Sequence, residues 1–255
     1  MRESIEIHIT ENGARRVIRA FGDIRRSAGA AASGVSALNT ALAALAGVMG
    51  VSKLMQWADR WATANGMIKT VTHSTEEYKT AQKELFEVAQ RTRTGLAEMA
   101  DLYGRVARAS DGLGMSQKDT MQFTESVGKA LVVQGRSTAQ VSGALLQLGQ
   151  LMTGNKVQAQ EYNSLIDQTP VILNAVAQGW KGGAITVAEL TARVKASTVT
   201  TKEFYDAFMA GAPMLEEQFA KMPLTFGQAM TVFGNAMTKL WGELNETFQI
   251  SDKFG

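Results

Sequence analysis

A chain of 255 residues is long enough for one substantial hydrophobic core and does not require two full domains. Its 45% hydrophobic and 20% charged residues are typical of a globular protein, and a formal net charge of +2 is too small to indicate nucleic acid as the main partner. The sequence contains no cysteine, which excludes a disulfide framework, a cysteine nucleophile and thiolate metal ligands.

The first residues predict a strand followed by a basic helix. Ile5, Ile7 and Ile9 alternate with polar side chains, which is typical of a half-buried strand. Residues 12–26 then place apolar side chains on one helical face, and arginines such as Arg15 and Arg19 carry the positive charge of the helix. This basic face is either simply solvated or contacts an acidic protein surface, a lipid or DNA.

Residues 27–52 contain no charged side chain. The segment is long enough to span a bilayer, but serine, threonine and asparagine dilute it, and alanine and glycine add little transfer energy. Small residues such as Gly29, Ser33 and Gly47 would let helix backbones approach closely. We therefore expect a protein–protein helix, within an oligomer or a surrounding sheath, and keep membrane insertion as the alternative.

The middle of the chain predicts a series of short helices separated by turns. A first helix carries Trp57 and Trp61, and Gly66 is expected to end or bend it. Later helix starts are marked by hydroxyl side chains, most of them with an acidic residue three positions on, or by proline in the first turn. These starts are Ser74 with Glu77, Thr94, Ser116 with Asp119, Ser137, Pro170, Thr186 with Glu189, Thr200 with Glu203, and Pro213.

The last predicted helix begins near Thr225 and is long and amphipathic. Its apolar stripe consists of Phe226, Met230, Phe233, Met237, Leu240, Trp241, Leu244 and Phe248. This stripe is expected either to pack on the preceding helices or, because methionine and aromatic side chains adapt to many surfaces, to contact another chain.

No group of residues in the sequence predicts catalysis, a cofactor or a metal. The two histidines, His8 and His73, are far apart and have no partner at metal-ligand spacing. Glu125 and Ser126 are similar to the glutamate–serine pair of lytic transglycosylases, but the rest of that pattern is missing. Peptidoglycan hydrolysis through Glu125 is therefore kept only as an alternative, and we expect a non-enzyme.

Residues 89–233 carry several short motifs in a specific order. The motifs are Leu102-Tyr103-Gly104-Arg105 with Arg108, the turn at Gly135, Gln147-Leu148-Gly149-Gln150-Leu151-Met152 before Gly154, Glu161-Tyr162-Asn163-Ser164 with Gln168 and Pro170, and Met222-Pro223-Leu224-Thr225-Phe226-Gly227. In this order and spacing the chain resembles the N-terminal domain of tape measure proteins of long-tailed phages and prophages. Independently of that resemblance, Gly104 in the middle of a helix indicates close packing of another helix there, bordered by Arg105.

The resemblance implies a structural protein of the virion that sets tail length from inside the tail tube and is assembled in the bacterial cytoplasm. It also implies tail tube protein, tail assembly chaperones and tail tip, baseplate or terminator components as partners, and a homo-oligomer such as a trimer. Fully helical, 255 residues reach only about 380 Å, so we expect a longer protein with its ruler segment beyond Gly255. Transient contact of residues 27–52 with the host membrane during DNA delivery is the alternative role.

The predicted fold class is therefore all-α, a compact multi-helix domain with an N-terminal strand and helical arm. We expect an arm over residues 1–73, the helical domain over residues 74–224, and a long amphipathic helix over residues 225–255 that leads toward a ruler. The candidate interaction residues are Arg15, Arg19, Gly29, Ser33, Gly47, Tyr103, Gly104, Arg105, Phe226, Met230, Phe233 and Trp241.

Overall fold

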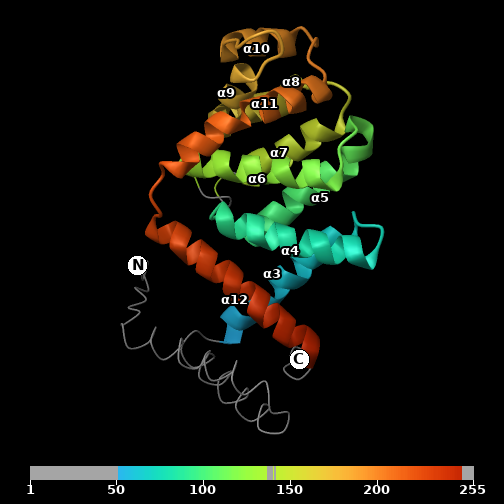
Figure 1. Cartoon of the computed structure of the whole chain (residues 1–255), viewed down its shortest axis with the longest axis vertical. Helices are drawn as coiled ribbons and strands as arrows, with labels where there is room; N and C mark the ends of the chain where they lie inside the picture. Colours follow the sequence, from blue (N-terminus) through green and yellow to red (C-terminus); the bar gives the residue numbers. More distant parts are fainter. Residues whose placement is uncertain (1–50, 137–139, 141, 249–255) are drawn as a thin grey trace, which may run out of the picture. The chain divides into compact units, whose positions relative to one another are not determined.

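The computed structural model describes residues 51–136, 140 and 142–248 (Figure 1). Within those ranges the chain forms α-helices and no named strand, which confirms the all-α class; the sole extended pairing there is a bridge between Lys156 and Thr200. The strand, the basic helix and nearly all of the uncharged segment predicted for residues 5–52 lie outside the described residues. Over the described ranges, no helix is both long and apolar enough to cross a bilayer.

The chain divides into two compact units, residues 1–56 and residues 57–255, and the helices below belong to the second unit except for the first turns of α3. With the labels of Figure 1, they are α3 (Val51–Lys69), α4 (Thr75–Arg91), α5 (Leu96–Leu113), α6 (Gln117–Val133), α7 (Ser142–Thr153), α8 (Ala159–Gln168), α9 (Pro170–Gln178), α10 (Val187–Lys195), α11 (Thr201–Ala220) and α12 (Phe226–Phe248).

Local capping fixes several of these helix starts, as the sequence predicted. Ser116, Thr186 and Thr200 each accept a hydrogen bond from the backbone N–H three residues on, and the acidic residue at that position reaches back to the cap. Ser74 also caps α4, but there the carboxylate of Glu77 accepts from the N–H of His73, at 2.7 Å. Each such cap stabilises its helix by about 1 kcal/mol.

Two predicted helix boundaries are not found. Helix α11 continues through Pro213 to Ala220, so the prediction that a helix starts at this proline is wrong. Gly211 and Leu215 are buried on either side of Pro213, and their packing holds the helix together although the proline removes one hydrogen bond. Helix α3 likewise continues through Gly66 to Lys69, so this glycine does not end the helix, and the alternative that it bends α3 stays a prediction. The start expected at Ser137 lies outside the described residues.

The core of the second unit is formed where α11 packs on α6 and α9 (Figure 1). Phe208 of α11 meets Phe123 of α6 edge to face, with ring centroids 5.1 Å apart. Three residues further along α11, Gly211 lies so close to Ala175 of α9 that a Cβ at Gly211 would overlap the alanine backbone. Phe204, Phe208 and the α9 side chains Leu173 and Val176 are fully buried there.

Candidate interaction surface

Helix α12 starts with a reciprocal pair of hydrogen bonds between Thr225 and Gln228. The N–H of Gln228 donates to Thr225 Oγ1, and the N–H of Thr225 donates to Gln228 Oε1, each at 3.2 Å. This is the capping-box arrangement with glutamine as the second residue. The sequence Thr225-Phe226-Gly227-Gln228 therefore carries its own cap for the first turn of α12.

The middle of α12 is attached to the turn between α4 and α5 by the amide of Asn235. The side-chain nitrogen of Asn235 donates to the carbonyl of Thr94 at 2.7 Å, and its oxygen accepts from the N–H of Leu96, the first residue of α5, at 3.0 Å. Asn235 is buried, so both bonds are shielded from water. One side chain thus supplies part of the N-terminal cap of α5 from a distant helix.

Arg93 holds the connection between α11 and α12. Its Nη1 donates to the carbonyls of Met222 and Pro223, each at 3.1 Å, and to Gln228 Oε1 at 3.3 Å. The guanidinium also lies over the ring of Phe219, 4.9 Å from its centroid. Arg93 has a positive φ of 56°, a left-handed conformation that is unfavourable for a non-glycine residue. These contacts fix the start of α12 relative to the α4–α5 turn.

Residues 237–242 of α12 pack within the chain. Trp61 of α3 packs on Gly242, where a Cβ would overlap the indole ring. Met237 and Trp241 are buried with it. Trp241, one of the candidate interaction residues, therefore contributes to packing within the chain.

The N-terminal half of α12 is different, because its apolar side chains face outward. Among the described residues, the large hydrophobic side chains that are exposed all belong to this part of the chain: Leu224 is 59% exposed, Phe226 82%, Met230 37% and Phe233 38%. We call these four residues the α12 patch. No charged residue occurs between Lys221 and Lys239. Exposed apolar side chains gathered in one place are typical of a contact with another molecule.

The motif Tyr103-Gly104-Arg105 lies mainly in the interior. Tyr103 is buried, and the helix that passes Gly104 is α3, whose Met67 carbonyl would be 3.7 Å from a Cβ at this glycine, an ordinary contact distance. Gly149 of α7 is packed more closely than Gly104. A Cβ at Gly149 would come within 2.9 Å of Arg105 Cβ and would overlap the rest of the arginine side chain. Arg105 also pairs with Asp101 at 3.0 Å. These residues therefore pack α5 against its neighbours.

The other candidate residues, Arg15, Arg19, Gly29, Ser33 and Gly47, lie outside the described ranges.

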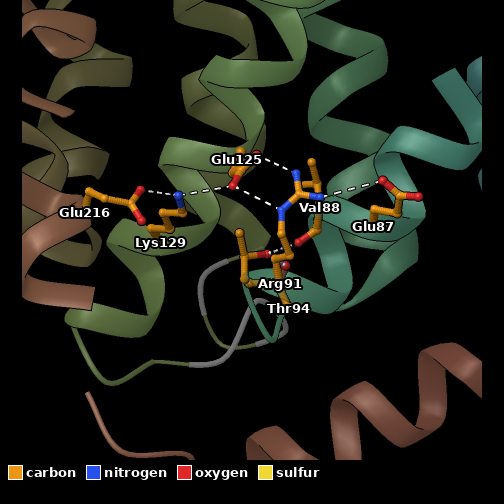
Figure 2. Close-up of polar contacts among 8 residues, drawn as sticks. Glu87, Val88, Arg91, Thr94, Glu125, Lys129 and Glu216 are labelled. Atoms are coloured by element: carbon orange, nitrogen blue, oxygen red, sulfur yellow. Dashed lines mark hydrogen bonds and ion pairs between the residues drawn. The ribbon is translucent and has the colours of Figure 1, made fainter. Parts of the chain in front are cut away.

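Glu125 belongs to a chain of charged side chains that links three helices (Figure 2). Arg91 of α4 donates to both oxygens of Glu125 on α6, at 2.8 and 3.4 Å. Lys129, one turn further along α6, lies 3.1 Å from Glu125 and also pairs with Glu216 of α11. Glu87 adds a weaker contact to Arg91 at 3.7 Å.

This arrangement does not suit Glu125 as a general acid. Burial acts to raise the pKa of its carboxyl, but the hydrogen bonds from Arg91 and Lys129 outweigh burial and hold the pKa below the ordinary value. A general acid working near neutral pH needs the opposite shift. Across the described residues, no group of three or more histidine, cysteine or acidic side chains could hold a metal ion. The Glu125 network is best explained as a structural link among α4, α6 and α11.

The turn after α4 also fits tightly against α6. Thr92 donates from Oγ1 to the carbonyl of Val88 at 2.7 Å and shares a second hydrogen bond with Thr94. Gly128 of α6 faces this hydroxyl, and a Cβ at that position would lie 2.9 Å from Thr92 Oγ1. The turn that carries Arg93 and receives Asn235 is therefore supported from α6 as well as from α12.

The described residues thus form a helical packing domain. Charged groups link its helices, glycines allow close helix contacts, and one long helix carries an exposed apolar patch. The chain belongs to the tape measure protein family, because the model of that family matches residues 52–246. It is also similar to the probable tape measure proteins of Lactococcus phages p2 and SK1, at 29% identity over 143 residues in each case. That alignment covers 55% of this chain and 13% of each relative. No solved structure matches the chain.

Proposed function

We propose that this chain is part of a tape measure protein that sets tail length from within the tail tube of a long-tailed phage or prophage. The observation that carries the proposal is the family match over residues 52–246, which includes nearly every described helix. The role is structural, and the lowered pKa of Glu125 supports that conclusion because it argues against the one catalytic candidate in the sequence.

In this proposal the three parts of the chain have different tasks. Residues 1–73 are the proposed arm, with a short N-terminal strand and helices, and its last helix, α3, packs on the compact unit through Trp61. Residues 74–224 are the proposed packing domain, and residues 225–255 are proposed to lead toward the ruler. The anchoring of α12 by Arg93 and Asn235 supports the proposed role of this helix, because it gives the helix a fixed direction relative to the α4–α5 turn. Tail tube protein, assembly chaperones and tail tip, baseplate or terminator components are the proposed partners, in the virion and during assembly in the host cytoplasm.

A complementation experiment tests the proposal. The coding sequence is deleted from the phage or prophage, the protein is supplied from a plasmid, and tails in lysates are counted and measured by negative-stain electron microscopy. Deletion should abolish tails of normal length, and the wild-type protein should restore them. Normal tails without the protein would overturn the proposal.

Two variants make the experiment sharper. Glu125→Gln should restore normal tails, because the proposed role needs no proton transfer at this carboxyl. Leu148→Asp should fail, because Leu148 is fully buried and an unpaired carboxylate there would unfold the domain. Loss of tails with Glu125→Gln in a protein that is folded would argue for a chemical role.

A further inference from the structure

Helix α12 lies outside the main hydrophobic cluster of the molecule. Among the described residues, that cluster contains side chains from each helix between α3 and α11, these two included, and none from α12. Met237 and Trp241 are buried but do not belong to it. The cluster residue Trp61 packs on Gly242, where α12 has no side chain. The main cluster therefore stays intact when α12 changes its position.

Polar contacts attach α12 to the rest of the chain at several points. Arg93 bonds to the connection that precedes the helix, and Asn235 bonds to the α4–α5 turn. Further along the helix, the ammonium of Lys239 lies 4.6 Å from the centroid of the Phe86 ring on α4. Water can replace hydrogen bonds of this kind, so each contributes much less than its strength in isolation. These attachments therefore orient α12 at a low cost of release.

Helix α12 contains the groups that keep it helical when it is released. Its first turn is capped by Thr225 and Gln228, which belong to the same segment. Residues 221–225, between α11 and α12, are not helical (Figure 1). Pro223 in this connection has no N–H and does not continue the helix. A short non-helical connection is where backbone rotation turns one rigid element against another.

Arg93 occupies a backbone position that favours glycine. Helix α4 ends in a Schellman motif, in which the N–H of Thr94 donates to the carbonyl of Ala89 at 3.0 Å and the N–H of Arg93 donates to that of Gln90 at 3.3 Å. Arg93 is the left-handed residue of this motif, with a φ of 56°. Glycine adopts such a φ without strain, whereas the arginine side chain reaches the carbonyls of the connection. The contact with residues 221–225 is therefore what the arginine adds at this position.

From these contacts we propose that α12 rotates away from the domain as one helix about residues 221–225, and that Arg93 holds it in the closed position of this structure. In the closed position the α12 patch is accessible, whereas Met237 and Trp241 are buried. Opening adds these two side chains to the accessible apolar stripe. A partner that binds the longer stripe favours the open position, because it contacts residues that the closed position hides. Binding at α12 thus changes the direction in which the helix leaves the domain.

Thiol labelling of single-cysteine variants of the full chain tests whether α12 opens separately from the core. The chain has no cysteine, so the reaction with a chromogenic disulfide reagent reports the introduced residue alone. Thr238→Cys places the thiol on α12, and Val176→Cys is the matched control on α9, since both positions are buried and β-branched. Thr238→Cys should react at least about tenfold faster, because opening α12 costs less free energy than unfolding the core. Equal rates would overturn the proposal.

Urea separates opening of the whole helix from a small local fluctuation around Thr238. Release of α12 exposes apolar surface, so labelling of Thr238→Cys should accelerate with urea well below the unfolding midpoint. A local fluctuation exposes almost no surface, and its labelling rate does not change over this range of urea. A rate that stays constant would therefore contradict the release of α12 as a unit.

Two second-site changes test the separate opening and the role of Arg93. Leu165→Ala weakens the core, which stays folded in both positions of α12, so it should accelerate labelling of Val176→Cys and leave Thr238→Cys unchanged. Ile172→Val makes a smaller cavity and replaces Leu165→Ala if that variant does not fold. Arg93→Gly should accelerate labelling of Thr238→Cys several-fold and change Val176→Cys less, because glycine also relieves the positive φ.

The outcome that contradicts separate opening is equal acceleration of both thiols by the core cavity, because α12 would then open only when the whole domain unfolds. Labelling of Thr238→Cys that does not change with Arg93→Gly would remove Arg93 from the proposal. None of these measurements involves tails, so the opening of α12 and the proposed function can fail separately.

Discussion

The side-chain oxygen of Asn235 lies 3.0 Å from the backbone nitrogen of Leu96, although the two residues are 139 positions apart in the sequence. This contact, with the reciprocal bond to Thr94, joins the long last helix to the first turn of α5. The two hydrogen bonds of Asn235 thus fix the direction of α12 relative to the packing domain. A single substitution of Asn235 removes both of them.

Asn235→Ala should lower the free energy of unfolding by about 1–3 kcal/mol, because the buried Leu96 N–H and Thr94 carbonyl would lose their partner. Urea denaturation followed by circular dichroism measures this change. Asn235→Asp keeps the acceptor for Leu96 but removes the donor to Thr94 and should also be destabilising. An unchanged urea midpoint for Asn235→Ala would show that water replaces the amide and that α12 is not held at this point.

Arg93 should control how firmly the α11–α12 connection is held. Arg93→Gly relieves the positive φ of 56° but removes the hydrogen bonds to Met222, Pro223 and Gln228. We expect trypsin to cleave after Lys221 several-fold faster in this variant, as measured by gel densitometry over time. If the backbone conformation alone mattered, cleavage would be unchanged or slower.

Gly211 should not tolerate even one additional carbon atom. A Cβ there would lie 2.7 Å from the carbonyl carbon of Ala175 and would overlap its oxygen, so Gly211→Ala should cost about 1–3 kcal/mol or more through displacement of α9. Gly66→Ala is the control, because α3 has open space at that position and alanine should stabilise the helix by about 0.5–1 kcal/mol. Thermal unfolding of both variants measures the effects, and a neutral Gly211→Ala would refute the close packing of α9 and α11.

The Glu125 network predicts a specific dependence of stability on pH. The pKa of Glu125 is lower in the folded protein than its ordinary value of 4.5, so its contribution is fully present above about pH 4.5 and is lost as the pH falls through the folded pKa. Glu125→Gln should therefore reduce stability at pH 7 by about 1 kcal/mol and make the decline below pH 4.5 shallower. Urea midpoints measured between pH 3 and pH 7 give both quantities. Parallel pH curves for the two proteins would contradict the lowered pKa.

Local signals in the sequence were sufficient to predict much of the helical pattern. Ser116, Thr186 and Thr200 act through hydrogen bonds to residues three positions away, so a short window of sequence contains the whole interaction. Pro213 failed as a boundary because the packing of α11 on distant helices outweighs the local cost of proline. The packing of α9 on α11 was missed, although Ala175 and Gly179, and Ala207 and Gly211, show small residues four positions apart.

The sequence predicts the apolar stripe of the candidate interaction surface, but not which of its residues are exposed. The apolar stripe of α12 is visible from its periodicity, but which part of it stays open depends on where the domain ends. Trp241 is buried next to Gly242, where α12 meets Trp61 of α3, whereas Phe226 is 82% exposed. Asn235 and Arg93 act through hydrogen bonds to residues more than a hundred positions away in the sequence. No local sequence pattern predicts these bonds.

The most direct test of the central claim is tail length in virions made with a lengthened protein. An in-frame insertion of about forty residues of heptad-repeat helix after Phe248 should lengthen tails by roughly 60 Å, at about 1.5 Å per residue. An insertion of the same length in the exposed turn at Gly182 and Gly183 should leave tail length unchanged, because that turn lies in the packing domain. Tails of unchanged length with the first insertion, in virions that contain the protein, would contradict the account.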